Sequence, residues 1–333
     1  MGVKKIGVMG CGVVADYGHL PSIVATPGLE LTALFDPDPV RLKAQTDRYQ
    51  VPGFSTQEAF FGQQLDAVVV ASPAWAHREN VLGAAAHGIH VLCEKPIAMD
   101  DAEGEEMIRA MEGADRMFFI GYVYRFSPVA MQMKRWIDEG TVGRIRSLRL
   151  IYCWDLHGRY EQQPDGAWVE SPRWQGRMEE GGPMVDCGVH QIDLARWWVG
   201  SEVARTTVAA AWVADYAAPD HVYLHLDHAD GAHTMVEMSF TYGHTAKEPA
   251  PIFSYDLIGD GGTLRYDRNG YVLEARTGRE TIRVPGASEK NFAGMYLEFE
   301  RALRTGETGH MPTARDGLIA TRLAREATDR AMA

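Results

Sequence analysis

Hydrophobic and polar positions follow one pattern over the first 122 residues and another after Arg125. In the first part, short and nearly all-apolar runs such as Ala67-Val68-Val69-Val70-Ala71 are separated by amphipathic stretches. Unbroken apolar runs are typical of strands that helices cover on both faces, and the amphipathic stretches supply those helices. The pattern therefore predicts a doubly wound α/β domain with a parallel sheet over residues 1–122.

The elements of this first domain follow from the same pattern. Its strands are expected at Lys5–Met9, Leu29–Phe35, Leu65–Ala71, His90–Cys93 and Met117–Gly121. Its helices are expected at Val13–Ala25, Trp75–His87 and Asp100–Met111.

Longer strands follow one another in the second part, separated by Asp-Gly, Gly-Asp-Gly and Arg-Asn-Gly turns. Such turns between consecutive strands are typical of an antiparallel sheet, so residues 123–333 are predicted to form an α+β domain. The strands are expected at Ile145–Cys153, Thr206–Tyr216, Val222–His228, His233–Thr241, Phe253–Gly259, Gly262–Tyr266, Tyr271–Glu274 and Thr281–Val284. The helices are expected at Pro128–Glu139, Pro183–Trp198, Asn291–Thr305 and Thr313–Ala331.

Composition and charge narrow the function classes. The chain has 333 residues, of which 46% are apolar and 23% charged, as in a folded protein of one large or two ordinary domains. The 45 acidic residues exceed the 33 Lys and Arg by 12, and such a surface repels phosphate backbones and anionic lipids. We therefore expect neither nucleic acid nor a membrane as partner. Without a membrane span or a cleavage-type leader pattern, a cytoplasmic location is expected.

Cysteine and histidine positions do not indicate a metal site. The four cysteines lie far apart without a C-x-x-C motif, which favours reduced and mostly buried thiols. They are Cys11, Cys93, Cys153 and Cys187. Histidines 221, 225, 228 and 233 cluster, but only alternate residues of a strand share a face, and no thiol or carboxylate set completes a tetrahedral site. No metal is expected.

A glycine-rich turn is the strongest local motif. Gly10, Gly12 and Ala15 form a G-x-G-x-x-A pattern between the first strand and the first helix. Gly10 permits the tight turn, Gly12 lets the backbone approach a pyrophosphate, and Ala15 allows close helix packing. Asp36, 24 residues beyond Gly12, ends the next strand, where a carboxylate can accept bonds from a ribose diol. The alternative is an ordinary strand-to-helix turn followed by a turn aspartate.

Two further motifs follow later strands of the first domain. Ser72-Pro73 ends one strand, with His77 four residues after Pro73, and Glu94-Lys95-Pro96 ends the next. Ligands of open parallel sheets bind outside the carboxyl ends of the strands. A lysine there can hydrogen-bond a substrate hydroxyl and lower its pKa, although a lysine after a strand is often only a solvated surface charge.

The helix predicted from Pro183 carries a polar stripe. Asp186, His190 and Asp193 lie at i, i+4 and i+7 and share one face. Because the opposite stripe is apolar, these residues face either solvent or a cleft. Gly188 costs about 1 kcal/mol inside the helix unless a close approach offsets it, which favours the cleft. The apolar stripe consists of Val185, Val189, Ile192 and Trp197.

Aromatic and polar residues crowd the irregular stretch before that helix. Such a set suits a sugar ring, and a subunit contact rich in Trp and Arg would look similar, so both interpretations stay open. The residues are Trp154, Asp155, His157, Arg159, Trp168, Arg173 and Trp174.

Together these motifs resemble the Gfo/Idh/MocA family of sugar and cyclitol oxidoreductases. The resemblance also includes the segment Tyr124-Arg125-Phe126-Ser127-Pro128, and the order of the motifs matches over the whole chain. It implies an N-terminal Rossmann domain, a C-terminal domain with an open, mainly antiparallel sheet, bound NAD(P), and a homodimer or homotetramer built on that sheet. Two departures are Ser72-Pro73-Ala74 in place of Thr-Pro-Asn and Glu180-Gly181-Gly182 in place of three glycines.

The resemblance also assigns roles to residues. The family's catalytic lysine falls on Lys95, and its aspartate and histidine fall on Asp186 and His190. Cofactor contacts are implied for Gly10, Cys11, Gly12, Val13, Val14, Asp36, Ser72, Pro73, His77, Glu94 and Lys95. Substrate contacts are expected for Tyr124, Arg125, Trp154, His157, Arg159, Arg173 and Trp174.

We therefore expect an NAD-dependent dehydrogenase that oxidises a secondary hydroxyl of a sugar or cyclitol, or works in reverse. NAD is expected in preference to NADP because the charge of Asp36 repels a 2′-phosphate. Against this, Arg41 lies near the start of the helix that follows Asp36 and can swing toward such a phosphate. A redox-neutral glycosidase or epimerase with tightly held NAD is an alternative within enzymology. A non-catalytic NAD-binding regulator is the alternative from another class, and intact Lys95, Asp186 and His190 disfavour it.

Overall fold

The computed structural model describes residues 2–154, 160–163, 165–170, 176–178, 180–243, 246, 248 and 250–333. The chain forms two compact units. The first consists of Met1–Phe126 and Lys290–Ile319, and the second of Ser127–Glu289 and Ala320–Ala333. This division differs from the expected 1–122 and 123–333, because the chain returns to the first unit near its end.

A six-stranded parallel sheet is the centre of the first unit, with the order β3-β2-β1-β4-β5-β6. The strand order reverses at β1, which lies between β2 and β4, and doubly wound sheets bind ligands at such a switch point. The expected parallel sheet is confirmed, and the short β3 is an addition to it. The strands are β1 (Lys4–Met9), β2 (Leu29–Phe35), β3 (Gly53–Phe54), β4 (Ala67–Val70), β5 (His90–Cys93) and β6 (Phe118–Ile120).

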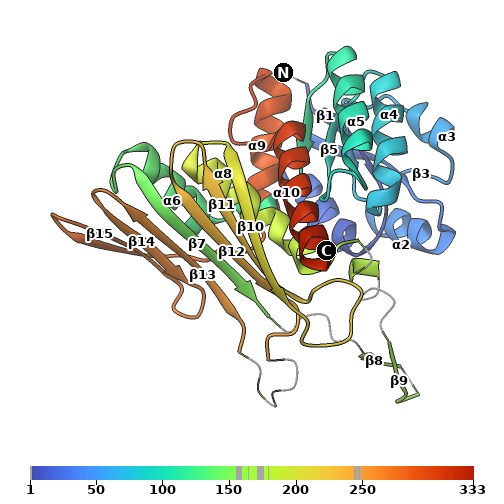
Figure 1. Ribbon diagram of the computed structural model, residues 1–333. Helices are drawn as coiled ribbons and strands as arrows, with labels where there is room; N and C mark the ends of the chain where they lie inside the picture. The colour runs from blue at the N-terminus through green and yellow to red at the C-terminus, as the bar shows by residue number, and fades with distance from the viewer. Residues whose placement is uncertain are drawn as a thin grey trace. The chain divides into compact units, whose positions relative to one another are not determined.

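Helices cover this sheet, and Figure 1 shows α4 and α5 beside each other in the cyan part of the chain. The first helical stretch begins at Val13 and includes a π-helical segment. Helix α3 was not expected from the pattern, and α2 was expected only as a helix that begins near Arg41. The helical elements are η1 (Ala15–His19), α1 (Leu20–Ala25), α2 (Pro39–Tyr49), α3 (Gln57–Phe61), η2 (Ala74–Ala76), α4 (His77–Ala86), α5 (Asp101–Gly113), η3 (Val123–Phe126) and α9 (Phe292–Thr305).

Helix α9 belongs to the first unit because its apolar face completes that unit's core. Met295, Tyr296 and Phe299 are fully buried and join one cluster with the inward residues of β1, β4 and α1. Asn291 caps the helix by accepting the Gly294 N–H, and its side-chain amide donates to a carbonyl of η3. Burial of several large side chains outweighs the loss of chain entropy, so residues far apart in sequence share one core.

The second unit contains an eight-stranded sheet with the order β10-β11-β12-β7-β13-β14-β15-β16. All its neighbouring strands pair antiparallel except β12 and β7, which confirms the mainly antiparallel sheet. The strands are β7 (Ile145–Cys153), β10 (Val203–Ala211), β11 (His221–His228), β12 (His233–Ser239), β13 (Ile252–Gly259), β14 (Gly262–Asp267), β15 (Val272–Thr277) and β16 (Thr281–Pro285). A separate two-stranded pair consists of β8 (Tyr160–Gln162) and β9 (Trp168–Glu170).

Strand β10 ends at Ala211, five residues before the expected end at Tyr216. The buried carboxylate of Asp220 accepts the backbone N–H groups of Val213 and Ala214. Those donors are then lost to the sheet, so the strand cannot continue. Asp220 lies seven and six positions after these two donors, and no sequence motif marks the contact.

Helices line only one face of this sheet in the described part of the unit (Figure 1). Val222, Leu224 and Leu226 are fully buried on the helical side, whereas His221, Tyr223 and His225 alternate with them and are half-buried on the other side. The unit's helical elements are α6 (Pro128–Asp138), η4 (Met184–Gly188) and α8 (Val189–Val199), and α10 (Ala314–Met332) is divided between the two units.

All four cysteines carry free thiols, and Cys187 alone of the four is partly exposed. Among the described residues, no helix combines the length and the apolar character that a membrane crossing requires.

Candidate active site

The glycine turn after β1 packs directly on the end of β4. Gly10 has a φ of +102°, and a Cβ there would lie 2.7 Å from the backbone carbon of Ala71 and the nitrogen of Ser72. Only glycine has both the conformation and the space for this position. The Gly10 N–H donates to the Phe35 carbonyl at 2.8 Å, which ties the turn to the end of β2.

Asp36 lies beside this turn at the end of β2 and is 6% exposed. One carboxylate oxygen accepts the Cys11 N–H at 2.7 Å and the other accepts the Asp38 N–H at 2.8 Å. These two bonds fix the carboxylate, and each oxygen keeps a lone pair for a further donor. Arg41 forms an ion pair with Asp38 at 3.3 Å. Burial and the charge of Asp36 raise the pKa of the Cys11 thiol to about 12, so the thiol stays protonated.

These features fit a dinucleotide. No heavy atom lies within 4 Å of the Cβ position of Gly12, so the backbone of the turn can be approached closely. The helical stretch that begins at Val13 has unsatisfied N–H groups and the positive end of its dipole at the same turn, which suits a pyrophosphate.

His77 connects the loops that follow β4 and β5. Its Nε2 lies 2.9 Å from the Ser72 carbonyl oxygen, and its Nδ1 lies 3.0 Å from that of Pro96. Complete burial lowers the pKa of His77, so the neutral ring is favoured. A neutral ring has one N–H, which donates to one of the two carbonyls at a time. The expected cofactor residue His77 is therefore held by backbone groups at the carboxyl edge of the sheet.

A buried chain of polar side chains supports the segment that carries Lys95. The Lys95 N–H donates to Glu94 Oε2, and Glu94 Oε1 lies 3.0 Å from His19 Nε2. His19 Nδ1 lies 2.7 Å from the Tyr296 hydroxyl. Because the Glu94 carboxylate only accepts hydrogen bonds, His19 donates to it from Nε2. The Lys95-Pro96 peptide bond is cis, and the Lys95 side chain is half-exposed.

Sequence analysis missed His19 and Tyr296. The two residues are 277 positions apart, and Tyr296 looks like any apolar-face residue of an amphipathic helix. His19 lies 75 residues from Glu94, in a helical stretch that also contains Asp16 and Ser22, so its polar character gave no distinct signal.

In the second unit, η4 and α8 carry the expected polar stripe, and the helix is buried on nearly all sides. Asp186 is 9%, His190 2% and Asp193 0% exposed, so none of them faces solvent in the way that an outer helix face does. The turn from Met184 to Gly188 is π-helical, a form often found at functional sites. A Cβ on Gly188 would collide with the sulfur of Met184, which is the close approach that the glycine indicated.

Arg177 is the charge partner of Asp186. Its guanidinium lies 3.2 Å from Asp186 Oδ2, and both side chains are mostly buried. The Cys187 thiol lies 3.5 Å from the same oxygen. Sequence analysis did not single out Arg177, because it lies nine positions before Asp186 in the irregular stretch and shares no helical spacing with it.

Trp154 is partly buried and packs against a small cluster of Met178, Ala218 and Phe240, which Cys187 also contacts. Its ring lies 4.6 Å from that of Tyr152, centroid to centroid. The substrate role of Trp154 stays a prediction. Asp155, His157, Arg159, Arg173 and Trp174 lie outside the described residues, and so does the side chain of Trp168.

The remaining two expected substrate residues, Tyr124 and Arg125, are buried in the first unit at 4% exposure each. The guanidinium of Arg125 lies 3.6 Å from the Asp316 carboxylate. This ion pair holds Arg125 in place in η3, so the residue has a structural role besides the substrate contact that was expected of it.

The chain matches the models of two protein domains. Residues 4–122 match the oxidoreductase family with the NAD-binding Rossmann fold, and residues 130–265 match the GFO/IDH/MocA C-terminal domain. Together these ranges cover most of the chain and agree with the two folds described above.

Similar proteins include inositol 2-dehydrogenase 2 of Saccharopolyspora erythraea, which is 28% identical over 96% of this chain and 91% of its own. The 2,7-anhydro-N-acetylneuraminate hydratase of Mediterraneibacter gnavus is 25% identical over 88% of this chain and 80% of its own. An oxidoreductase from Agrobacterium radiobacter, solved with NAD+, L-tartaric acid and magnesium, has a TM-score of 0.82 at 22% identity, covering 99% of this chain and 96% of its own. The glycine turn, the Rossmann sheet and the matching second domain establish that this chain belongs to the Gfo/Idh/MocA family of oxidoreductases.

Proposed function

We propose that this protein is an NAD-dependent dehydrogenase that oxidises a secondary hydroxyl of a sugar or cyclitol to a ketone, or reduces the ketone. The proposal rests on a set of acid–base side chains whose backbone positions are fixed by buried hydrogen bonds or by a buried helix. Lys95 follows β5 on a segment held by buried hydrogen bonds, and Asp186 and His190 share one buried helix. Similarity to an inositol 2-dehydrogenase over most of both chains supports the substrate class.

Each of these residues has a proposed task. His190 takes the hydroxyl proton, because a neutral imidazole can act as general base near neutral pH. Lys95 donates a hydrogen bond to the same oxygen and stabilises the negative charge that develops there. Asp186, held by Arg177, orients the substrate and His190. Bound nicotinamide supplies the acceptor for the hydride.

We propose NAD as the preferred cofactor. Asp36 is held in place with free lone pairs, which suits the two hydroxyls of an adenosine ribose, and its charge opposes a 2′-phosphate. Arg41, the one cation near this position that sequence analysis noted, is already paired with Asp38.

The proposed substrate is a neutral or weakly anionic polyhydroxylated ring. Trp154 packs against the same small cluster as Cys187, the residue after Asp186, and aromatic faces stack on the C–H groups of sugars. Replacing Trp154 by Ala should then lower kcat/KM on the best substrate by more than the fivefold that corresponds to about 1 kcal/mol. A smaller loss would mean that the substrate is held elsewhere.

A redox-neutral reaction is the second candidate, and one observation favours it. A relative that covers 88% of this chain is a hydratase, whose named reaction adds water and has no net change of oxidation state. The two candidates differ in what accumulates, because a dehydrogenase reduces added NAD continuously whereas a redox-neutral enzyme converts substrate without it.

The test is a screen of sugars and cyclitols with added NAD, followed by absorbance and by product analysis. We expect continuous NADH formation with at least one substrate. Lys95→Ala and His190→Ala should each lower kcat by about 100-fold or more while NAD still binds. Lys43→Ala, which removes an exposed lysine from α2, is the control and should keep full activity. Product formation without accumulation of NADH would contradict the dehydrogenase proposal and support the redox-neutral enzyme.

The family resemblance also leads us to propose a homodimer or homotetramer. Light scattering coupled to gel filtration measures its mass directly, and a monomer at micromolar concentration would contradict this proposal.

A further inference from the structure

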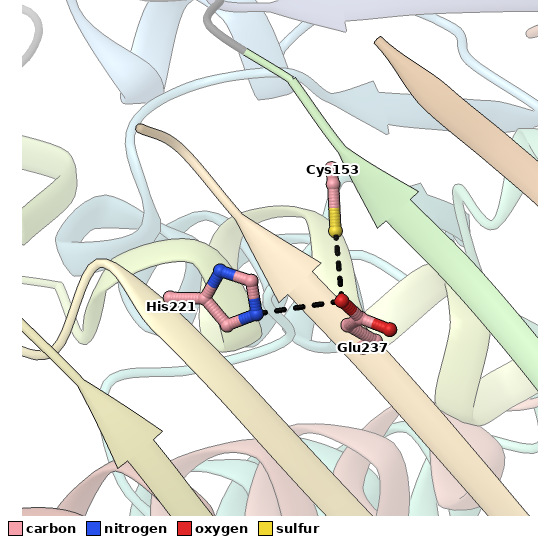
Figure 2. Close-up of side chains that lie close together, drawn as sticks. All are labelled: Cys153, His221 and Glu237. Carbon is pink, nitrogen blue, oxygen red and sulfur yellow. Dashed lines mark hydrogen bonds and ion pairs between the residues drawn. The ribbon is translucent and has the colours of Figure 1, made fainter. Parts of the chain in front are cut away.

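Three side chains from three neighbouring strands meet on the sheet face that no described helix covers. Figure 2 shows Cys153 from β7, His221 from β11 and Glu237 from β12 pointing toward one another. Cys153 Sγ lies 3.6 Å from Glu237 Oε1, and His221 Nε2 lies 3.4 Å from the same oxygen. The three candidate ligand atoms all lie within 4.8 Å of one another.

The strand register explains the cluster. Ser239 of β12 pairs with His221 on one side and with Cys153 on the other. Glu237 precedes Ser239 by two positions, so it lies on the same face one step along the middle strand. The sequence analysis found no thiol or carboxylate for the histidines because these groups belong to other strands.

The geometry points to a binding site for a single zinc-class cation at Cys153, His221 and Glu237. In tetrahedral zinc sites with about 2.3 Å to sulfur and about 2.0–2.1 Å to nitrogen or oxygen, neighbouring ligand atoms lie about 3.3–3.6 Å apart. The two spacings given above, 3.6 Å and 3.4 Å, agree with these values. The third spacing, between the ligand atoms of Cys153 and His221, is at most 4.8 Å, so these two atoms must approach each other by up to about 1.2 Å to enclose the ion.

The contact between His221 and Glu237 is a close one without good hydrogen-bond geometry. The Nε2 atom of His221 is buried and makes no hydrogen bond of good geometry, although it lies 3.4 Å from the carboxylate. A buried polar atom without a bond costs free energy, and a cation at this point would remove the cost. Tyr223, whose pKa is raised by burial and by the charge of Glu237, stands beside that carboxylate.

Charge and chemistry also suit zinc. A thiolate, an imidazole and a carboxylate form a set that Zn²⁺ accepts readily, and the two anions balance its charge. Binding breaks the S–H bond of Cys153, forms the S–Zn bond and releases one proton to water. In the single chain the side chains of His221 and Glu237 are 15% and 19% exposed, so the fourth position is open to water there.

A nearby histidine pair is less complete. His225 Nδ1 and His233 Nε2 lie 3.2 Å apart, and the other nitrogen of His233 is bonded to Asp227. Within the described part of the chain, no third group joins these two nitrogens at the spacing that the Cys153 cluster has. His225 is therefore a matched control on the same strand and face.

The experiment uses the full chain after treatment with a chelator. Zinc is titrated against a chromophoric competitor, and Co²⁺ is added separately as a spectroscopic probe. We expect one equivalent of zinc, a rise in Tm on binding, and a cobalt spectrum with a thiolate charge-transfer band and intense tetrahedral d–d bands. Absence of tight binding, or a cobalt spectrum without the thiolate band, would overturn the assignment.

Substitutions locate the site. Cys153→Ser and His221→Gln should each lower zinc affinity by more than about 100-fold, beyond the loss typical when only an indirect partner of a ligand changes. His225→Gln should keep the affinity of the unmodified protein. Circular dichroism and Tm in the absence of metal show whether each variant folds. Should Cys153→Ser not fold, His221→Gln at a less buried position provides the second variant. Loss of binding in His225→Gln alone would move the site to the histidine pair and disprove the proposal.

Discussion

Asp36 is the residue to which we assign the proposed preference for NAD. Its two oxygens are fixed by the N–H groups of Cys11 and Asp38, so its charge stays at one point. We predict that Asp36→Ser lowers the ratio of kcat/KM for NAD to that for NADP by about tenfold or more, since about 1.4 kcal/mol corresponds to a factor of ten. Steady-state kinetics with both cofactors measures the ratio.

The control for this prediction is Asp47→Ser, which removes an exposed carboxylate of α2 that pairs with Lys43. It should leave the ratio unchanged. A wild-type enzyme that uses NADP as well as NAD would contradict the role of Asp36 directly.

Glu94 makes stability depend on pH. Burial raises its pKa, but the hydrogen bond and charge of His19 outweigh burial and lower the pKa to about 2 from an ordinary 4.5. A pKa lowered by folding stabilises the native state above pH 4.5, and this contribution is lost as the pH falls toward 2. The difference corresponds to about 3 kcal/mol.

We therefore predict that wild type exceeds Glu94→Gln in free energy of unfolding near pH 6 and that this gap narrows by about 3 kcal/mol between pH 5 and pH 2. Urea unfolding of both proteins across this range measures the gap. Glu106→Gln is the control, because this carboxylate is more exposed and pairs with Arg78 at the surface. A gap that does not change with pH would show that Glu94 is not ionised in the native state.

At the scale of elements, the turn between β1 and the first helix contains two glycines with different predicted roles, one in folding and one in cofactor binding. Gly10→Ala adds a Cβ against the backbone of Ala71 and Ser72 at a φ of +102°, so we predict a loss of stability of about 1–3 kcal/mol. Gly12→Ala adds a Cβ in open space. It should leave Tm nearly unchanged but weaken NAD binding by about tenfold or more, because the added methyl group occupies the approach of the pyrophosphate.

Thermal unfolding without cofactor and calorimetric titration with NAD test this pair of variants. Equal Tm values for both variants, or unchanged NAD affinity in Gly12→Ala, would show that the turn does not act in this way.

Element prediction from sequence succeeded where the cause is local. The helix at Pro183–Trp198 was expected from its proline and periodicity and is found as η4 and α8. Helix α2 was expected only near Arg41 and without bounds, although Pro39 begins it and Asp38 caps it through the N–H groups of Val40 and Arg41. The helix is polar on average, and this polarity masked the apolar stripe along one of its faces.

At the scale of the whole molecule, the first unit depends on residues near the other end of the chain. Phe299 of α9 is fully buried in the core of that unit and lies against Phe119 of β6. We predict that Phe299→Ala destabilises the protein by about 3–5 kcal/mol and weakens NAD binding, although residue 299 is far from the glycine turn in sequence. Leu297→Ala, at a 57% exposed position of the same helix, is the matched control.

Urea unfolding and NAD titration of both variants test this prediction. If Phe299→Ala were no more destabilising than Leu297→Ala, the return of residues 290–319 to the first unit would not be needed for its stability.

The sequence by itself determined the order of elements, the two sheet types and the cofactor turn. Each of these depends on neighbours in the chain: glycines that permit a turn, runs of apolar residues, and a carboxylate at the end of a strand. Lys95, Asp186 and His190 belong to short motifs as well, and their catalytic roles stay predictions from the family resemblance.

Only the tertiary structure decided which distant groups meet. Arg177 pairs with Asp186 across an irregular stretch, and Tyr296 reaches His19 across 277 residues. Cys153 joins the histidine and carboxylate of two other strands through the register of the sheet. Such contacts follow from how helices and strands pack and pair, and no local pattern encodes them. Closing a loop over a long separation costs little more free energy than closing a short one, so distance along the chain does not prevent these contacts.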